Sequence, residues 1–253
     1  MKSFRILQFS DTHLFADPAA KFYDIVPDEN LGQVISYARE HAATATFSLL
    51  TGDLVHDESR QGYKLVRHHF EALEMPVFCV PGNHDDSAMM QAVFSGEPIK
   101  FIPSYRFHNW LFVFLDSSVS GHQEGHLTDD QLHSLDQLLT SHSDSHIMIV
   151  LHHPLLPCGS HWMDSVMLLD NPEQVFAVMD RFDHVRAVIW GHIHQEFSTL
   201  RNNMMMLGAP STSVQFKPDS HEFETDASQP GYRVLDLYEN GDIQTHVERV
   251  GKD

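Results

Sequence analysis

The sequence predicts an α/β fold in which mixed β-sheets pack face to face and helices cover their outer surfaces. Short apolar runs rich in β-branched residues recur along the chain, as expected for buried strands. Early in the chain, amphipathic helical segments separate these runs. Late in the chain, strand-like runs dominate. Strands and helices that alternate early in the chain, followed by a strand-rich part, are typical of sheets that share a core and carry helices on their outer faces.

Five of the apolar runs end directly at residue types that bind metals. The runs at 4–10, 46–50, 77–80, 146–151 and 185–190 lead into Asp11-Thr12-His13, Gly52-Asp53, Gly82-Asn83-His84-Asp85, His152-His153-Pro154 and Gly191-His192-Ile193-His194. In open α/β sheets, ligands bind at the carboxyl ends of the strands. Five separate loops can therefore bring Asp, His and Asn side chains to one place.

Four further strands are predicted in the middle and at the end of the chain. They span 110–115, 204–207, 232–238 and 243–250. The last of these alternates apolar and polar side chains, as a half-exposed strand does. The stretch from Gln215 to Gly231 lacks such a pattern, and we predict an irregular surface loop there.

Four helices are predicted from apolar residues at helical spacing, which we assign to the core. Their stripes are Leu31, Val34, Ile35 and Ala38; Leu65, Phe70 and Leu73; Leu132, Leu135, Leu138 and Leu139; and Val175, Val178, Met179 and Phe182. Three helix starts carry capping signals, namely Ser59, Thr128 with Gln131 three residues on, and Asn171 before Pro172. Most of the 20 histidines, such as His41 and His68, are expected on solvated helix surfaces.

A length of 253 residues allows one large domain or two small ones, and we predict a single domain spanning residues 1–253. The chain is 42% hydrophobic, and it contains no linker-like stretch and no repeat of fixed period. Its apolar runs fall short of the roughly 20 residues that a membrane span needs, and the N-terminus lacks a signal-peptide pattern. The two cysteines, Cys79 and Cys158, do not imply a disulfide framework. We therefore expect a cytoplasmic protein.

The strong negative charge limits the partners. With 35 acidic and 16 basic residues, the formal net charge is −19. Proteins that bind nucleic acids carry basic surfaces, because neutralising phosphates supplies most of their affinity. The charge therefore argues against nucleic acid, including as a nuclease substrate, and against an anionic membrane. The sequence leaves the oligomeric state open, with a homodimer as one option.

The candidate ligands favour first-row transition metals. Imidazole suits Mn, Fe, Zn and Co, and hard oxygen ligands favour Mn and Fe. Two such ions about 3.5–4 Å apart can share one carboxylate, deprotonate a bridging water near neutral pH and hold a phosphoryl oxygen. This chemistry predicts hydrolysis of a phosphate ester by in-line attack.

Each motif taken alone also has a structural explanation. Gly52-Asp53 can form a turn, and His152-His153 can be a hydrogen-bonded core pair. The Asn83-His84-Asp85 segment can start a helix, where we expect Asp85 or Asp86 to be the cap. It is the presence of all five motifs in this order, each after a strand-like run, that indicates a metal centre.

The ordered motifs resemble the signature of the calcineurin-like metallophosphoesterase superfamily: Asp-x-His, Gly-Asp, Gly-Asn-His-Asp or Glu, His, and Gly-His-x-His. The resemblance implies a four-layer α/β/β/α sandwich and two metal ions per chain, with Fe or Mn expected first and Zn or Co as alternatives. It implies one metal held by Asp11, His13, Asp53 and His194, and a second held by Asp53, Asn83, His152 and His192. Asp53 would bridge the two ions.

The resemblance also assigns roles at the substrate. His84 would be the catalytic residue, contacting the phosphate and protonating or stabilising the leaving oxygen. Asn83 and His194 would contact the substrate as well, and His153 would support a ligand. The segment 52–58 lacks the Asp-Arg-Gly of protein Ser/Thr phosphatases, which argues against protein phosphatase activity.

Flanking segments extend the resemblance to bacterial class III cyclic-nucleotide phosphodiesterases over nearly the whole chain. The matching segments are 6–15, 115–118, 125–127, 191–196, 210–218 and 230–233. The implied reaction opens 3',5'-cyclic AMP to 5'-AMP. Two alternatives remain: the same metal centre could act on another small phosphodiester, such as a glycerophosphodiester or a 2',3'-cyclic nucleotide, or the fold could be a non-catalytic scaffold.

The substrate pocket is expected from residues 159–164 and 211–216. Within it, Trp162 or His161 is expected to line the side that receives the base. The alternative for Trp162 is a place in the hydrophobic core.

Overall fold

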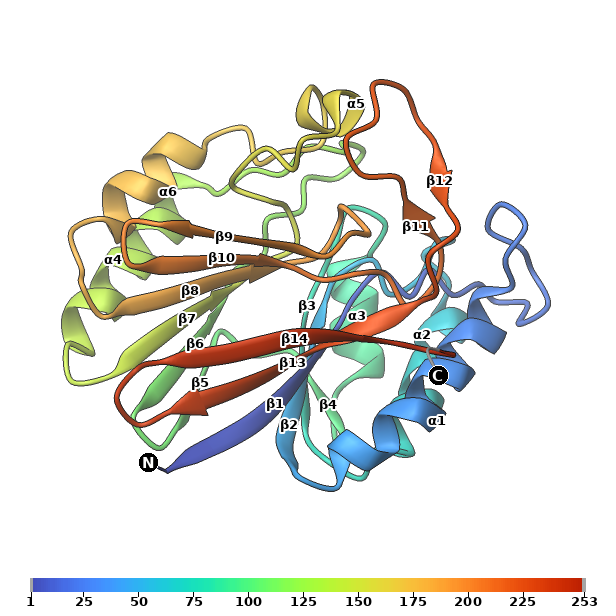
Figure 1. Ribbon diagram of the computed structural model, residues 1–253, viewed down its shortest axis with the longest axis horizontal. Helices are drawn as coiled ribbons and strands as arrows, with labels where there is room; N and C mark the ends of the chain where they lie inside the picture. The colour runs from blue at the N-terminus through green and yellow to red at the C-terminus, as the bar shows by residue number, and fades with distance from the viewer. Residues whose placement is uncertain (1, 252–253) are drawn as a thin grey trace.

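The computed structural model describes residues 2–251 as two six-stranded sheets packed face to face, with helices on both outer sides (Figure 1). The first sheet has the order β14-β13-β1-β2-β3-β4, and the second has the order β5-β6-β7-β8-β10-β9. This four-layer α/β/β/α arrangement confirms the predicted fold class.

Both sheets are mixed: the first has antiparallel pairing at one edge only, and the second has an antiparallel strand at each edge. The first comprises β1 (Ser3–Phe9), β2 (Ala45–Thr51), β3 (Val77–Val80), β4 (Ile99–Lys100), β13 (Gly231–Tyr238) and β14 (Ile243–Arg249). The second comprises β5 (Ser104–Phe107), β6 (Trp110–Phe114), β7 (His146–Val150), β8 (Val185–Trp190), β9 (Phe197–Arg201) and β10 (Met204–Gly208). Strands β1 to β4 are parallel, as are β6, β7, β8 and β10. The carboxyl ends within each parallel group therefore meet at one edge.

Helices cover the two outer faces because their apolar stripes pack on the sheets. The first sheet carries α1 (Pro27–Ala42), α2 (Arg60–Glu71) and α3 (Ser87–Val93), and the second carries α4 (Asp129–Ser141), α5 (His161–Asp164) and α6 (Pro172–Met179). A third core lies between the sheets and includes Phe47, Trp110 and Phe112. The predicted stripes face these cores, with Leu65, Leu138, Val178 and Phe182 only partly buried.

The helix caps mostly follow the sequence prediction. The Ser59 side chain accepts a hydrogen bond from the Gly62 amide, and Thr128 forms the predicted capping box with Gln131. The cap of α3 is Asp86, and the alternative of Asp85 is wrong. Asn171 occupies the N-cap position of α6 without a capping bond, because its side-chain oxygen accepts the Leu127 amide at 3.1 Å instead.

The segment predicted as an irregular surface loop is partly ordered, so that prediction is wrong at its start. It contains β11 (Gln215–Phe216) paired with β12 (Thr225–Asp226), and both residues of β11 are buried. Phe216 is held inside because its ring stacks on His194 at 4.1 Å between centroids. This short ribbon therefore forms one wall of the site described below.

Three observations bear on domain organisation and setting. The single domain over 1–253 stays a prediction, and its ends at 1 and 252–253 lie outside the described residues. Cys79 and Cys158 are free thiols. Across residues 2–251, none of the helices has the length and apolarity needed to cross a bilayer.

Candidate metal centre

The strand ends bring all seven predicted metal ligands together. The loop after β1 supplies Asp11 and His13, those after β2, β3 and β7 supply Asp53, Asn83 and His152, and the loop after β8 supplies His192 and His194. All except Asn83 are at most 4% exposed. Buried carboxylates and imidazoles are costly unless they are paired or bind metal, so this density of polar groups requires a specific explanation.

One half of the cluster is built around His13 and His194. Their Nε2 atoms lie 3.1 Å apart. Asp11 Oδ1 lies 3.4 Å from His194 Nε2, and Asp53 Oδ2 lies 3.7 Å from His13 Nε2. These four donor atoms are those that the sequence assigns to the first metal.

The other half is built around His152. Its Nε2 lies 2.9 Å from His192 Nδ1, 3.2 Å from Asn83 Oδ1 and 3.3 Å from Asp53 Oδ2. Asp53 Oδ2 therefore faces both halves, as a bridging carboxylate would. The role of each residue as a ligand remains a prediction.

The orientation of the imidazoles fits a metal centre. His152 Nδ1 donates to the Thr51 carbonyl at 2.7 Å, and His194 Nδ1 donates to the Val214 carbonyl at 2.8 Å. These bonds fix the tautomer and turn the Nε2 lone pair of each ring into the cluster, the arrangement that metal-binding histidines adopt. Imidazole nitrogens, carboxylates and one amide oxygen together suit two transition ions better than calcium or magnesium.

Backbone strain is concentrated at the same residues. Asp11, His13, Asp53, His192 and His194 have φ angles of 54°, 47°, 53°, 67° and 51°. A non-glycine residue in this left-handed region costs on the order of 1–3 kcal/mol and persists where surrounding structure enforces it. Five such residues within one cluster indicate that the turns are held to aim these side chains.

The electrostatics of the cluster depend on Asp53. Burial opposes its ionisation, but His152 and His13 outweigh burial and lower the pKa of Asp53 well below its usual range. Asp53 in turn overcomes the burial of His152 and raises its pKa to about 9. Burial lowers the pKa of His13 and of His192 well below the usual range, which favours the neutral form of both rings. A neutral imidazole beside a carboxylate is ready to bind a cation.

His153 lies behind the cluster as a neutral core residue. Ser117 Oγ lies 2.8 Å from its Nδ1, and its Nε2 donates to the Gln123 carbonyl at 3.1 Å. Burial, with a contribution from His152, lowers the pKa of His153 to about 3. Its ring packs against His192 at 4.7 Å between centroids. His153 is therefore placed to orient His192.

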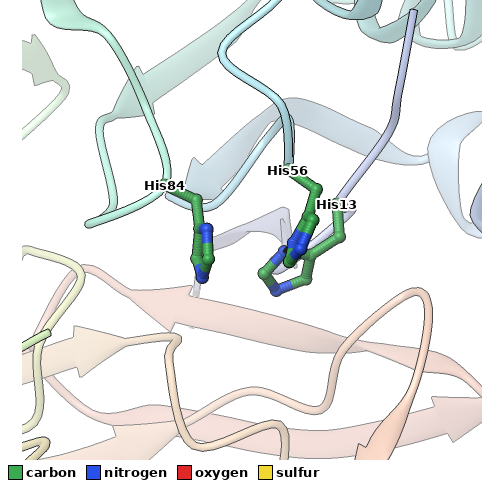
Figure 2. Close-up of side chains that lie close together, drawn as sticks. All are labelled: His13, His56 and His84. Carbon is green, nitrogen blue, oxygen red and sulfur yellow. Dashed lines mark hydrogen bonds between the residues drawn. The ribbon is translucent and has the colours of Figure 1, made fainter. Parts of the chain in front are cut away.

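His84 lies at the open side of the cluster, and it is accompanied by a histidine that the sequence reasoning missed. Figure 2 shows the imidazoles of His13, His56 and His84 converging from separate loops. The His84 ring stacks on His56 at 4.6 Å, and the His84 amide donates to Asp53 Oδ1 at 2.9 Å. His56 Nδ1 lies 3.3 Å from His13 Nδ1. His56 therefore supports both a predicted ligand and the predicted catalytic residue.

A pocket of about 460 Å³ opens above the cluster, with a polar floor and an aromatic wall. Its floor includes His13, Asp53, Asn83, His84, His192 and His194, and its wall includes Phe22, Tyr23, Trp162, Phe216 and Phe223. Trp162 lines this pocket and also packs on Phe216, and its role toward a base stays a prediction. His161 is absent from the lining of this pocket, and its ring stacks on His221 instead.

The residues that sequence reasoning missed come from loops. His56 lies three residues after Asp53, and this closeness to a predicted metal ligand could have indicated that His56 belongs to the site. Phe22, Tyr23 and Phe223 carry no periodic signal, because their segments reach the pocket only through the tertiary fold. Tyr23 and Phe223 stack on each other at 5.1 Å, which joins the 16–26 and 217–224 loops over the pocket.

The chain is similar to known proteins along its length. Residues 4–196 match the calcineurin-like phosphoesterase family. The chain is 34% identical over 247 residues to the 3',5'-cyclic adenosine monophosphate phosphodiesterase CpdA of Haemophilus influenzae, covering 97% of this chain and 90% of that protein. It is 35% identical over 245 residues to the protein of the same name from Pseudomonas aeruginosa, covering 97% and 89%.

A solved structure supports the fold independently. A dimetal phosphatase from Danio rerio superimposes with a TM-score of 0.69 at 18% sequence identity, covering 98% of this chain and 99% of that one. At this identity the likeness shows the fold alone. Because the family match spans most of the chain and relatives above 30% identity cover nearly all of it, the chain belongs to the calcineurin-like phosphoesterase family.

Proposed function

We propose that this chain, a metal-dependent phosphodiesterase, hydrolyses 3',5'-cyclic AMP to 5'-AMP in the pocket above the ligand cluster. The relatives named as cyclic AMP phosphodiesterases support this substrate. The observation that carries the proposal is the aromatic wall, because a purine has flat faces to stack against it and a glycerophosphodiester has none.

Part of the pocket lining exposes apolar surface to solvent. Tyr23 and Phe223 of the aromatic wall are 50% and 44% exposed, and Val166, which also lines the pocket, is 52% exposed. Trp162 lies edge-on to Phe223 at 5.3 Å. Stacking of a nucleobase on an aromatic side chain contributes about 1–3 kcal/mol. A bound adenine would therefore cover apolar surface that otherwise faces water.

The polar floor would hold the phosphate. Asp11, His13, Asp53 and His194 would bind one metal, and Asp53, Asn83, His152 and His192 would bind the second. When bound, two such ions, with Fe or Mn expected and Zn or Co as alternatives, would supply a water of lowered pKa as the nucleophile and would offset phosphate charge. Asn83 and His194 line the same pocket, so both are placed to position the phosphate.

His84 would assist the leaving oxygen. Opening the ring to 5'-AMP breaks the bond between phosphorus and O3', which must gain a proton. His84 lines the pocket, and its backbone is tied to Asp53 while its ring is held against His56. A group fixed in this way can donate a proton to O3' or stabilise its charge.

The alternatives share most of these features. Another small diester, such as a glycerophosphodiester or a 2',3'-cyclic nucleotide, would use the same metal cluster, but a glycerophosphodiester leaves the aromatic wall uncovered. A non-catalytic scaffold of this fold would have no need for the complete ligand set. A small diester substrate also accords with the acidic chain, and with the cytoplasmic setting and the independence from nucleic acid and membranes that the sequence predicts.

Replacing Trp162 tests the base-binding side of the pocket. In Trp162→Ala, we expect the KM for cyclic AMP to rise about 5- to 150-fold, the equivalent of 1–3 kcal/mol of lost stacking. The KM for a base-free ribose 3',5'-cyclic phosphate should stay unchanged. Tyr37→Ala, at an exposed aromatic on α1 outside the pocket lining, is the matched control. An unchanged KM for cyclic AMP in Trp162→Ala would remove the assignment.

A further inference from the structure

A second group of metal-binding side chains lies away from the catalytic pocket. His41 at the end of α1 meets His246 and Glu248 of β14, and one donor atom from each lies within 4.8 Å of the other two. None of the three lines the pocket above the ligand cluster. The sequence predicted His41 as a solvated surface residue, yet its side chain is only 24% exposed.

The spacing of the donor atoms suits a small divalent ion. Glu248 Oε1 lies 3.1 Å from His246 Nε2 and 3.9 Å from His41 Nε2. In a tetrahedral zinc site with bonds of about 2.0–2.1 Å, neighbouring ligand atoms are about 3.3 Å apart. These two distances bracket this value, and the donor atoms of His41 and His246 lie within 4.8 Å of each other. His246 is 51% exposed, which leaves room for water as the fourth ligand.

A buried tyrosine fixes one of the three ligands. The Tyr232 hydroxyl lies 2.7 Å from His41 Nδ1. Tyr232 is fully buried, stacks on Phe9 and pairs with Glu248 across the β13–β14 ladder. When Nδ1–H donates to the tyrosine oxygen, the Nε2 lone pair of His41 faces the other two ligands. A partner behind a metal-binding histidine orients the ring in this way.

We propose that His41, His246 and Glu248 bind one zinc-class divalent transition ion. Two imidazoles and one carboxylate form a ligand set that suits zinc. Strand β14 is an edge strand that pairs with β13 alone, and its C-terminal part approaches α1 (Figure 1). Edge strands need protection from fraying and from mispairing. The ion would clamp this edge to the end of α1, which gives the site a structural role separate from catalysis.

Zinc stoichiometry of the full chain tests the proposal. We expect His246→Ala to bind one zinc fewer per chain than the wild type in equilibrium dialysis against Zn²⁺, with phosphodiesterase activity unchanged. His68→Ala, at an exposed histidine on α2, is the matched control and should bind as many ions as the wild type. The comparison depends on a difference between variants, so it stands whether or not the substrate assignment is right.

Tyr232→Phe tests the support of His41 while keeping the ring that packs on Phe9. Removing the hydrogen-bond partner of a metal-binding histidine typically weakens metal binding about 10- to 100-fold. In Tyr232→Phe we expect zinc affinity to fall by this factor at the site of His41, His246 and Glu248 and to stay unchanged elsewhere. Zinc should also raise the Tm of the wild type more than that of His246→Ala. Equal zinc numbers and equal Tm shifts in the wild type and His246→Ala would overturn the proposal.

Discussion

At the residue scale, Asp53 connects every part of the candidate active site. Its Oδ2 faces His13 and His152, one in each half of the ligand cluster. Its Oδ1 accepts the amide of His84. One carboxylate thus joins both predicted metals to the predicted catalytic residue. The roles of Asp53 and His84 can therefore be separated by metal content and by rate.

His84→Ala should keep its metals and lose catalysis. The His84 side chain lines the pocket, and its tie to Asp53 runs through the backbone, which alanine retains. We expect the rate to fall about 10²- to 10⁴-fold, the usual contribution of a general acid. Metal content by elemental analysis and kcat on cyclic AMP are the two measurements.

Asp53→Ala is the contrasting variant, because it removes the shared carboxylate and should lose both metals and turnover. Asp130→Ala, at an exposed acid on α4, should change neither. If His84→Ala lost its metals as Asp53→Ala does, the role assigned to His84 would be wrong.

At the element scale, the site is a set of sharp turns at strand ends. Asp85 ties two of them, because its carboxylate accepts the amides of Gly82 after β3 and Leu54 after β2. The close approach of these loops leaves no space at Gly82, where a Cβ would collide with Asp53 Oδ1 and the Asp53 amide. Glycine is therefore required there by the neighbouring loop, apart from any ligand role.

Gly82→Ala should displace Asp53 and so remove metals and turnover together. We also expect it to destabilise the fold by about 1–3 kcal/mol, the usual cost of overpacking. Urea denaturation and metal analysis measure the two effects. Gly32→Ala on α1 is the control, because its added Cβ meets only His69 at 3.5 Å. That variant should be stabilised by up to about 1 kcal/mol; full metal content in Gly82→Ala would contradict the account.

The sequence predicted the strand ends well because the pattern that forms them is local. A β-branched run followed by glycine or a polar residue predicts a strand and its end, and the parallel order then places Asp11, Asp53 and Asn83 together. Periodicity does not encode the way in which long loops fold back over the rest of the molecule. Tyr23 and Phe223 are far apart in sequence and meet only over the pocket. The burial of Phe216 likewise depends on its stacking with His194.

At the scale of the whole molecule, folding encloses neutral histidines that the metals would hold in place. Burial lowers the pKa of His13, His153 and His192. In the unfolded chain these side chains titrate near 6.5. Below that pH these side chains bind protons in the unfolded state but not in the folded state. The free energy of unfolding therefore decreases as the pH falls. His152 has the opposite sign, because its raised pKa gives stability that is lost as the pH rises through about 9.

The metal-free protein should therefore unfold more easily in mild acid. Because the pKa of His153 in the folded protein is about 3, this residue alone should lower the free energy of unfolding by about 1 kcal/mol when the pH falls from 6.5 to 5.5. Urea titrations of the metal-free wild type and His153→Gln at both pH values measure this change. The variant should lose about 1 kcal/mol less than the wild type over the interval. Equal losses would show that His153 does not remain neutral in the fold.

The central claim is that this acidic metallophosphoesterase hydrolyses 3',5'-cyclic AMP in a pocket with an aromatic wall. A chromatographic product assay on manganese-supplemented protein tests it most directly, with 3',5'-cyclic AMP, 2',3'-cyclic AMP and a glycerophosphodiester run in parallel. The account predicts that 5'-AMP from 3',5'-cyclic AMP forms fastest, and that chelation of the metals stops it. Faster cleavage of either other diester would contradict the substrate assignment and leave only the metal chemistry.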